Sequence, residues 1–292
     1  MDELLIILVR GLGLGAVFAL VAMSFNVVHS SSGILNFAQG NLFVLGGLFG
    51  FVFLPAEPSV AWWLVLLPLA TLALALAVAA QGWVTLLPLR SSIEQHSWLI
   101  TTLAVSVIIG AVLLIVQGTI QQTVKSPFAS FTFGGIRTPA PYVLTVVLAL
   151  AWYLALRWFH ARTLSGLAIS AIAQDLDAAR AAGLRVRRLQ VIAFAISGMI
   201  VGSAGFVAAP IIAIANDSGI AYVLNGFVAA VVGGLGSNLG ALVGGALVGV
   251  ASMYAAFEYG GEFQNAVSLA LLVGVLMLRP QGLFGRPAAR RV

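Results

Sequence analysis

The side chains of this sequence most able to bind a polar molecule are a small set of amides. They lie in two apolar, glycine-rich segments, residues 34–47 and 223–236, which share the local patterns ILNF and VLNG. Both segments are predicted to be broken or re-entrant helices, because irregular backbone at membrane depth is tolerated where it lines a cavity. Neutral amides in such a cavity suit a small polar or zwitterionic solute that binds briefly and weakly as it passes along a pathway. The predicted pathway residues are Asn36, Gln39, Asn41 and Asn225.

A structural role for these amides is the alternative. Polar side chains inside a helical membrane bundle also hydrogen-bond to neighbouring helices, and that role needs no solute. The sequence leaves both roles open.

Other residue types offer little support for catalysis. The three histidines, His29, His96 and His160, lie apart near the ends of apolar runs, and cysteine is absent, so no metal site is expected. The serines at 30–32 lack the accompanying histidine and acid pair of a nucleophile. The single lysine, Lys125, lacks the upstream glycines of a phosphate-binding loop. We predict a protein that is not an enzyme, has no cofactor and does not hydrolyse ATP itself.

The elements that must position the amides are membrane-spanning helices. Hydrophobic residues make up 61% of the 292 positions and charged residues only 8%, against about 25% charged in an average soluble domain. A helix needs about 20 mostly apolar residues to cross a membrane. We predict an all-α polytopic transmembrane bundle, one domain over residues 1–292, with eight to ten membrane segments. The apolar runs cover residues 4–28, 37–54, 60–82, 97–117, 140–159, 190–210, 220–235, 238–257 and 263–279.

Glycine spacing predicts that these helices pack closely. Two glycines four residues apart lie on one helix face and let two backbones approach each other in lipid. The pairs are Gly46 and Gly50, Gly198 and Gly202, Gly240 and Gly244, and Gly245 and Gly249. The pattern favours a tight bundle and assigns no function.

Basic residues in the short connections predict the orientation of the chain. Eleven of the fourteen Lys and Arg residues fall on one side, which is therefore expected to be cytoplasmic; the formal charge of +5 needs no nucleic-acid partner. The eleven are Arg90, Arg157, Arg162, Arg180, Arg185, Arg187, Arg188, Arg279, Arg286, Arg290 and Arg291. The N-terminus should lie outside and the C-terminus inside. Residues 118–139 should form the longest external loop, and residues 160–190 the largest cytoplasmic loop.

The cytoplasmic loop contains a predicted short helix between Gly166 and Gly183. Asp175, Asp177 and Arg180 would form a polar surface, and alanines a small-residue surface. A helix with such a smooth surface can dock into a groove of a partner, whereas a solvated connector is the alternative. The alanines are Ala171, Ala178, Ala179 and Ala182.

Several motifs together resemble the permeases of the branched-chain amino acid ATP-binding-cassette (ABC) transporter family. The stretch GLGLGAVFALVAMSFNVVHSSSGILNFAQGNLFVLGG, residues 11–47, is similar to the family's N-terminal signature. GGLGSNLGALVGGALVG at 233–249 and RPQGLFG at 279–285 are similar to its C-terminal ones. The loop pattern, followed by AFAISGMIVGSAG at 193–205, resembles the coupling loop that contacts the ATPase subunits. The residues of that pattern are Gly166, Ala171, Asp175, Ala178, Ala179 and Gly183.

The resemblance implies a multi-pass subunit of an importer in the bacterial inner membrane. The implied partners are two cytoplasmic ATPase subunits, a second permease subunit that is a related chain or a copy of this one, an external solute-binding protein and membrane lipid. The implied cargo is an amino acid of the branched-chain type, with amides, urea and small organic acids as other cargoes of such families. Ser170 stands where the family often has Arg, and Gln39 where it often has His. These departures bear on the ATPase contact and on cargo identity respectively.

The competing interpretation is a passive channel or facilitator for a small neutral solute such as urea or an amide. It would use the same amides without ATP. A proton-coupled carrier has less support, because no acidic residue falls in the middle of an apolar run.

Overall fold

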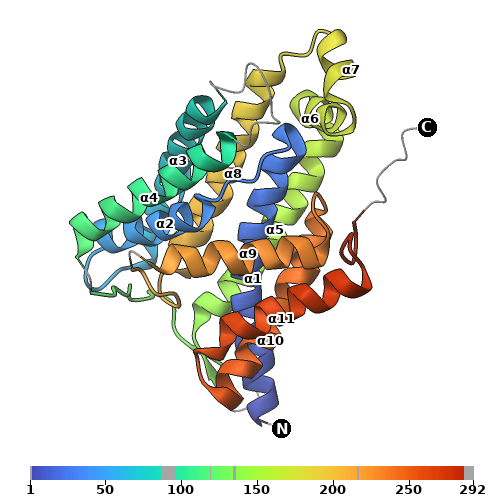
Figure 1. The fold of residues 1–292 in the computed structure, drawn as a ribbon. Helices are drawn as coiled ribbons and strands as arrows, with labels where there is room; N and C mark the ends of the chain where they lie inside the picture. Colours follow the sequence, from blue (N-terminus) through green and yellow to red (C-terminus); the bar gives the residue numbers. More distant parts are fainter. Residues whose placement is uncertain (1, 87–96, 119, 134–135, 216, 286–292) are drawn as a thin grey trace.

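The chain folds as a bundle of helices (Figure 1), and the computed structural model describes residues 2–86, 97–118, 120–133, 136–215 and 217–285. The predicted all-α class is confirmed, since the described strands form only one short antiparallel hairpin of β1 (Phe131–Phe133) and β2 (Ile136–Thr138). The helices are α1 (Asp2–Ser32), α2 (Gln39–Phe53), α3 (Val60–Thr85), α4 (Ser97–Gln117), α5 (Ala140–Arg162), α6 (Leu164–Gln174), α7 (Leu176–Ala181), α8 (Val186–Ala208), α9 (Ser218–Gly233), α10 (Asn238–Tyr259) and α11 (Phe263–Leu278).

Six helices in the described part of the chain, α1, α3, α4, α5, α8 and α10, are long and apolar enough to cross a membrane. Three further predicted segments correspond to α2, α9 and α11, which have 15, 16 and 16 residues. At a rise of about 1.5 Å per residue, such a helix reaches about 24 Å, less than the hydrocarbon core of about 30 Å. Figure 1 shows α9 running across α1 rather than alongside it. The predicted segments thus divide into six long helices and three short ones.

The two segments predicted to be interrupted differ in structure. Residues 33–38 are not helical and separate α1 from α2, and Gly33 leaves α1 with a φ of +68° that favours glycine. In contrast, α9 is continuous to Gly233, and the chain turns only at Gly234. The interruption therefore lies at the start of the first segment and at the end of the second.

The irregular segment 33–38 is held in the core by aromatic packing. Its Phe37 ring lies 6.5 Å from the ring of Phe25 on α1 and 6.3 Å from that of Phe227 on α9. Helix α1 itself packs against α5, α8, α9 and α10. The segment that begins the amide cluster is thus fixed against the central helix.

Glycines allow the closest helix contacts. A Cβ atom added to Gly15 on α1 would lie 2.6 Å from the carbonyl oxygen of Gly245 on α10, and one added to Gly46 on α2 would lie 2.7 Å from that of Gly202 on α8. These separations are too short for a real Cβ atom, so a larger residue would push the helices apart. The predicted packing role of the glycine pairs is confirmed at these positions.

The predicted orientation puts the N-terminus of α1 and the helices α6 and α7 on opposite sides of the membrane. Figure 1 shows the N-terminus of α1 at one end and α6 with α7 at the other. Lys125, in the predicted external loop, forms an exposed ion pair with Glu57, and Gln122 forms a β-bridge with Ile214. Of the basic residues used to predict orientation, Arg90, Arg286, Arg290 and Arg291 lie outside the described residues.

The orientation predicts a clear labelling pattern for exposed positions. In intact cells a membrane-impermeant maleimide should label Lys125→Cys, and it should label Arg185→Cys only after the membrane is opened. The native chain has no cysteine, so each variant carries a single reactive thiol. Labelling of Arg185→Cys from outside would reverse the assigned orientation.

Candidate functional site

The predicted pathway amides begin in segment 33–38, where Asn36 is fully buried. Asn36 and Gln81 of α3 form a reciprocal pair: Asn36 Nδ2 donates to Gln81 Oε1 at 3.1 Å, and Gln81 Nε2 donates to Asn36 Oδ1 at 2.8 Å. The same Asn36 oxygen accepts the N–H of Ala38 at 3.1 Å. One uncharged side chain therefore ties the irregular segment to a long helix and closes the turn before α2.

Gln39 and Asn41 lie in the first turn of α2 and contact two other helices. The Gln39 amide donates to the Ser197 hydroxyl on α8, and Asn41 Nδ2 donates to the backbone oxygen of Ser106 on α4 at 2.6 Å. Both side chains are buried, yet Gln39 Oε1 and Asn41 Oδ1 have no hydrogen-bond partner among the described residues. Burying an unpaired acceptor costs about 1–3 kcal/mol. These two oxygens are therefore places where a donor on a solute would be favourable.

The fourth amide lies farther along α9. Asn225 Nδ2 donates to the carbonyl oxygen of Ala221 at 2.9 Å and to Asn265 Oδ1 of α11 at 3.0 Å. Asn41 approaches the start of the same helix, because a Cβ atom added to Gly219 would overlap Asn41 Oδ1. The structure thus keeps Asn36, Gln39 and Asn41 on one short stretch, while Asn225 joins α9 to α11.

The hydrogen-bond partners of these amides were not predicted from the sequence. Gln81, Ser197, Ser106 and Asn265 all come from other helices. The position of Gln81 as an amide inside an apolar run was a usable signal, because a buried amide in lipid requires a partner. Which residue Gln81 pairs with depends on helix packing and cannot be predicted from the spacing of residues along the sequence.

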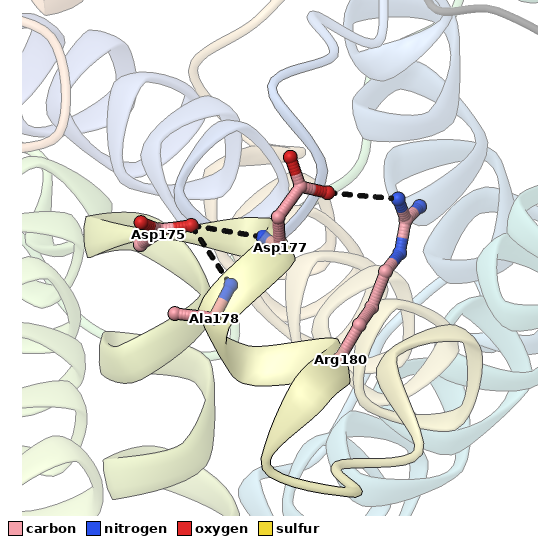
Figure 2. Close-up of polar contacts among 4 residues, drawn as sticks. All are labelled: Asp175, Asp177, Ala178 and Arg180. Carbon is pink, nitrogen blue, oxygen red and sulfur yellow. Dashed lines mark hydrogen bonds and ion pairs between the residues drawn. The ribbon is translucent and has the colours of Figure 1, made fainter.

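The predicted coupling segment, residues 163–183, folds as two short helices, α6 and α7, rather than one. Asp175 separates α6 from α7 with an extended backbone, φ −153° and ψ 109°. Its Oδ1 atom accepts the backbone N–H groups of Asp177 and Ala178, each at 2.9 Å (Figure 2). An aspartate N-cap satisfies donors that otherwise have no partner at a helix start. This cap breaks the predicted single helix at Asp175.

Helix α7 ends at a glycine in the left-handed region. The N–H of Leu184 donates to the carbonyl oxygen of Ala179 at 3.1 Å, and that of Gly183 to the oxygen of Arg180 at 3.0 Å. With a φ of +81° at Gly183, this is the Schellman arrangement, in which glycine is preferred. The predicted residues Asp175 and Gly183 therefore define the two ends of α7.

The structure divides the predicted small-residue surface. Ala171, Ala178 and Ala182 are exposed, whereas Ala179 is only 4% exposed and packs with Ile172. The expectation that Ala178 and Ala179 both face a docking groove is wrong for Ala179, because one face of the six-residue helix α7 must cover α6 and α8. The exposed ion pair of Asp177 and Arg180 lies beside Ala178 (Figure 2).

Gly166, the first residue of the predicted coupling pattern, is buried where α6 turns back on α5. A Cβ atom added there would lie 2.8 Å from the Cα atom of His160. The N–H of Gly166 donates to the hydroxyl of Thr163, the N-cap of α6, at 3.0 Å. Gly166 therefore sets the angle between α5 and the coupling helices and is not part of the exposed surface.

A cavity of about 1150 Å³ opens beside the coupling helices. Its walls come from the end of α1, the end of α5, the α6–α7 corner, the turn between α9 and α10, and Phe284. Asp175 of the coupling pattern lies in its wall, and the four predicted pathway amides are not among the described residues that line it. The predicted coupling surface and the buried amides are thus two separate places in this structure.

Comparison with known proteins identifies the family to which this sequence is similar. Residues 7–276 match the family model described as branched-chain amino acid transport system, permease component. The chain is 29% identical to the high-affinity branched-chain amino acid transport system permease protein LivH of Salmonella typhimurium, over 97% of this chain and 96% of that protein. It is 28% identical to the corresponding permease protein BraD of Pseudomonas aeruginosa, over 98% and 97%.

A solved structure supports the fold. PsaBC from Streptococcus pneumoniae, solved in complex with Fab, aligns with a TM-score of 0.50 at 12% identity, over 93% of this chain and 91% of that chain. At this identity the likeness concerns the fold alone. Together with the six long apolar helices and the match over residues 7–276, it is consistent with a multi-pass membrane protein. The chain belongs to the branched-chain amino acid transport system permease family.

Proposed function

We propose that this chain is the membrane-spanning permease subunit of an ABC importer that moves branched-chain amino acids into the cytoplasm. The observation that carries the proposal is the family match over residues 7–276, together with relatives of nearly equal length that are named as high-affinity branched-chain amino acid permeases. The relatives' names supply the cargo class. The energy source must be another chain, since this sequence has no phosphate-binding loop.

The proposed assembly contains two cytoplasmic ATPases, a second permease chain and an external solute-binding protein in the bacterial inner membrane. The exposed part of the coupling segment, Ala171, Ala178 and Ala182, would meet the ATPase, because a small-residue surface permits close helix contact. ATP-driven movement of the ATPases would then shift α6 and α7. Gly166 and Thr163 transmit that shift to α5 through the tight turn described above.

The amides at the start of α2 would form the closed part of the pathway. Asn36 and Gln81 satisfy each other, and Gln39 and Asn41 donate to neighbouring helices, so each donor has a protein partner before solute arrives. As the helices separate, a zwitterionic solute would replace these protein partners in the hydrogen bonds of the amides. The unpaired Gln39 Oε1 and Asn41 Oδ1 atoms would accept its ammonium hydrogens.

Reconstitution tests the proposal. The permease purified from its native host is expected to retain ATPase chains, and proteoliposomes of this complex should accumulate leucine only when ATP and the solute-binding protein are both present. A catalytically inactive ATPase provides the matched control. Leucine flux that is equal with and without ATP would instead indicate a passive facilitator and overturn the proposal.

A further inference from the structure

The cavity beside the coupling helices has a mixed chemistry that the proposed pathway does not use. Arg157 lines it near the end of α5, is exposed, and forms no ion pair within the described part of the chain. Asn238 lines it at the first residue of α10, and its buried Oδ1 atom accepts no hydrogen bond there. One wall thus offers a free guanidinium, and Asn238 at another has a buried oxygen that lacks a hydrogen-bond partner.

The remaining walls supply an apolar surface and negative charge. Ile169, Leu239 and Phe284 line the cavity with aliphatic and aromatic groups, and the carboxylates of Asp175 and Asp177 lie at its coupling-helix side. A guanidinium binds a carboxylate through two parallel hydrogen bonds, while acceptors and nearby carboxylates favour an ammonium group. The combination matches a ligand with a carboxylate, an ammonium group and an aliphatic side chain.

We infer that this cavity binds an aliphatic α-amino acid from the cytoplasm and thereby slows the transport cycle. The inference rests on the proposed function and on the predicted orientation, and it goes beyond them by assigning a second, regulatory amino-acid site. Arg157 would bind the carboxylate, Asn238 would turn its buried Oδ1 atom toward the ammonium group, and Ile169 and Leu239 would contact the side chain. A volume of about 1150 Å³ accommodates such a molecule together with water.

The position of the cavity explains how occupancy would act. One wall belongs to α6 and α7, and the opposite walls belong to α1, α5 and the turn before α10. A ligand that touches both sides favours the conformation in which these elements are close, and it shifts the population only because it binds the other conformation less well. Imported amino acid that accumulates in the cytoplasm would therefore hold the coupling segment against the bundle and reduce its own import.

The test uses the assembled transporter in proteoliposomes with the ATPases facing the bath and the solute-binding protein and leucine inside. L-leucine added to the bath is expected to lower ATP hydrolysis severalfold. Arg157→Gln should raise the half-inhibitory leucine concentration by about tenfold or more, because a charge-assisted hydrogen bond is lost, and should leave ATP hydrolysis without bath leucine unchanged. Asn238→Ala should raise it in the same direction. Arg162→Gln is the control, since Arg162 is exposed near the end of α5 and does not line the cavity.

Two leucine analogues test the recognition of both charges. Isovalerate lacks the ammonium group and isoamylamine lacks the carboxylate, so each should inhibit far less than leucine. Leucine inhibition that is unchanged in Arg157→Gln, or equal inhibition by isovalerate, would overturn the inference. So would inhibition that depends on phosphatidylethanolamine in the vesicles and not on leucine, because a zwitterionic headgroup would then be the ligand.

The same vesicles separate this inference from the proposed function. ATP-dependent movement of leucine out of the lumen, without any effect of bath leucine, would retain the importer and reject the regulatory site. Absence of ATP-dependent leucine movement would reject the proposed function itself.

Discussion

Ala178→Glu is expected to leave the permease in the membrane at normal levels but to remove most of the ATPase and nearly all transport. Ala178 is exposed on α7, so a longer side chain meets no atom of its own chain that must move. In the proposed complex the same side chain would enter a groove shaped for alanine. Overpacking costs about 1–3 kcal/mol, and an unpaired buried charge costs more, so docking should weaken by at least about tenfold. Co-purification of the ATPase and leucine uptake measure the two effects.

Two neighbouring variants make this result specific. Ala178→Ser keeps a small side chain and should retain both the ATPase and uptake. Ala179→Glu should instead destabilise the coupling segment itself, because Ala179 packs in the small core with Ile172 and Val186, and proteolysis of this segment should accelerate. Retention of ATPase and full uptake by Ala178→Glu would show that α7 is a solvated connector.

The second large effect is expected when the polar pair at the start of the pathway is replaced. Asn36→Leu alone should lower both stability and uptake, because it leaves the buried Gln81 amide and the Ala38 N–H without partners, at about 1–3 kcal/mol for each unpaired group. A single variant cannot separate a pathway role from packing. The double variant Asn36→Leu with Gln81→Leu removes both partners and should restore much of the stability.

Uptake by the double variant then distinguishes the two roles of these amides. If Asn36 and Gln81 contact the solute, uptake should stay severely reduced although thermal stability and ATPase retention recover. Gln81→Leu alone serves as the matched control, and it should resemble Asn36→Leu in stability. Recovery of uptake in the double variant would mean that the amides only join α3 to the segment 33–38.

The sequence predicted the long membrane-spanning helices more completely than the short ones. The long spans followed from the lengths of the apolar runs, because lipid demands a continuous apolar helix wherever it is crossed. The short helices α2 and α9 corresponded to the segments flagged by glycine, but α11 was not recognised as short. The predicted run, 263–279, agrees with the observed bounds of α11, Phe263–Leu278, so the ends of this helix were predicted and only its shortness was overlooked.

The coupling segment shows the same division at the level of single residues. Its good helix formers and flanking glycines predicted helical structure, and Asp175 was among the chosen residues. Its role as the N-cap that divides α6 from α7 depended on the actual backbone angles. The burial of Ala179 and exposure of Ala178 could not be derived either, since two adjacent alanines have the same chemistry and differ only in the face that meets α6 and α8.

The sequence by itself determined the class of this protein: a helical membrane bundle that packs through glycine, with Asn36, Gln39, Asn41 and Asn225 in two glycine-rich segments. Those properties depend on composition and on local spacing, which lipid and helix geometry convert directly into structure. Tertiary structure decided the pairing of Asn36 with Gln81, the two unpaired amide oxygens on α2, and the cavity that Arg157 and Asn238 line from different walls. Asn36 and Gln81 lie 45 positions apart along the chain, and only helix packing determines which distant residues meet.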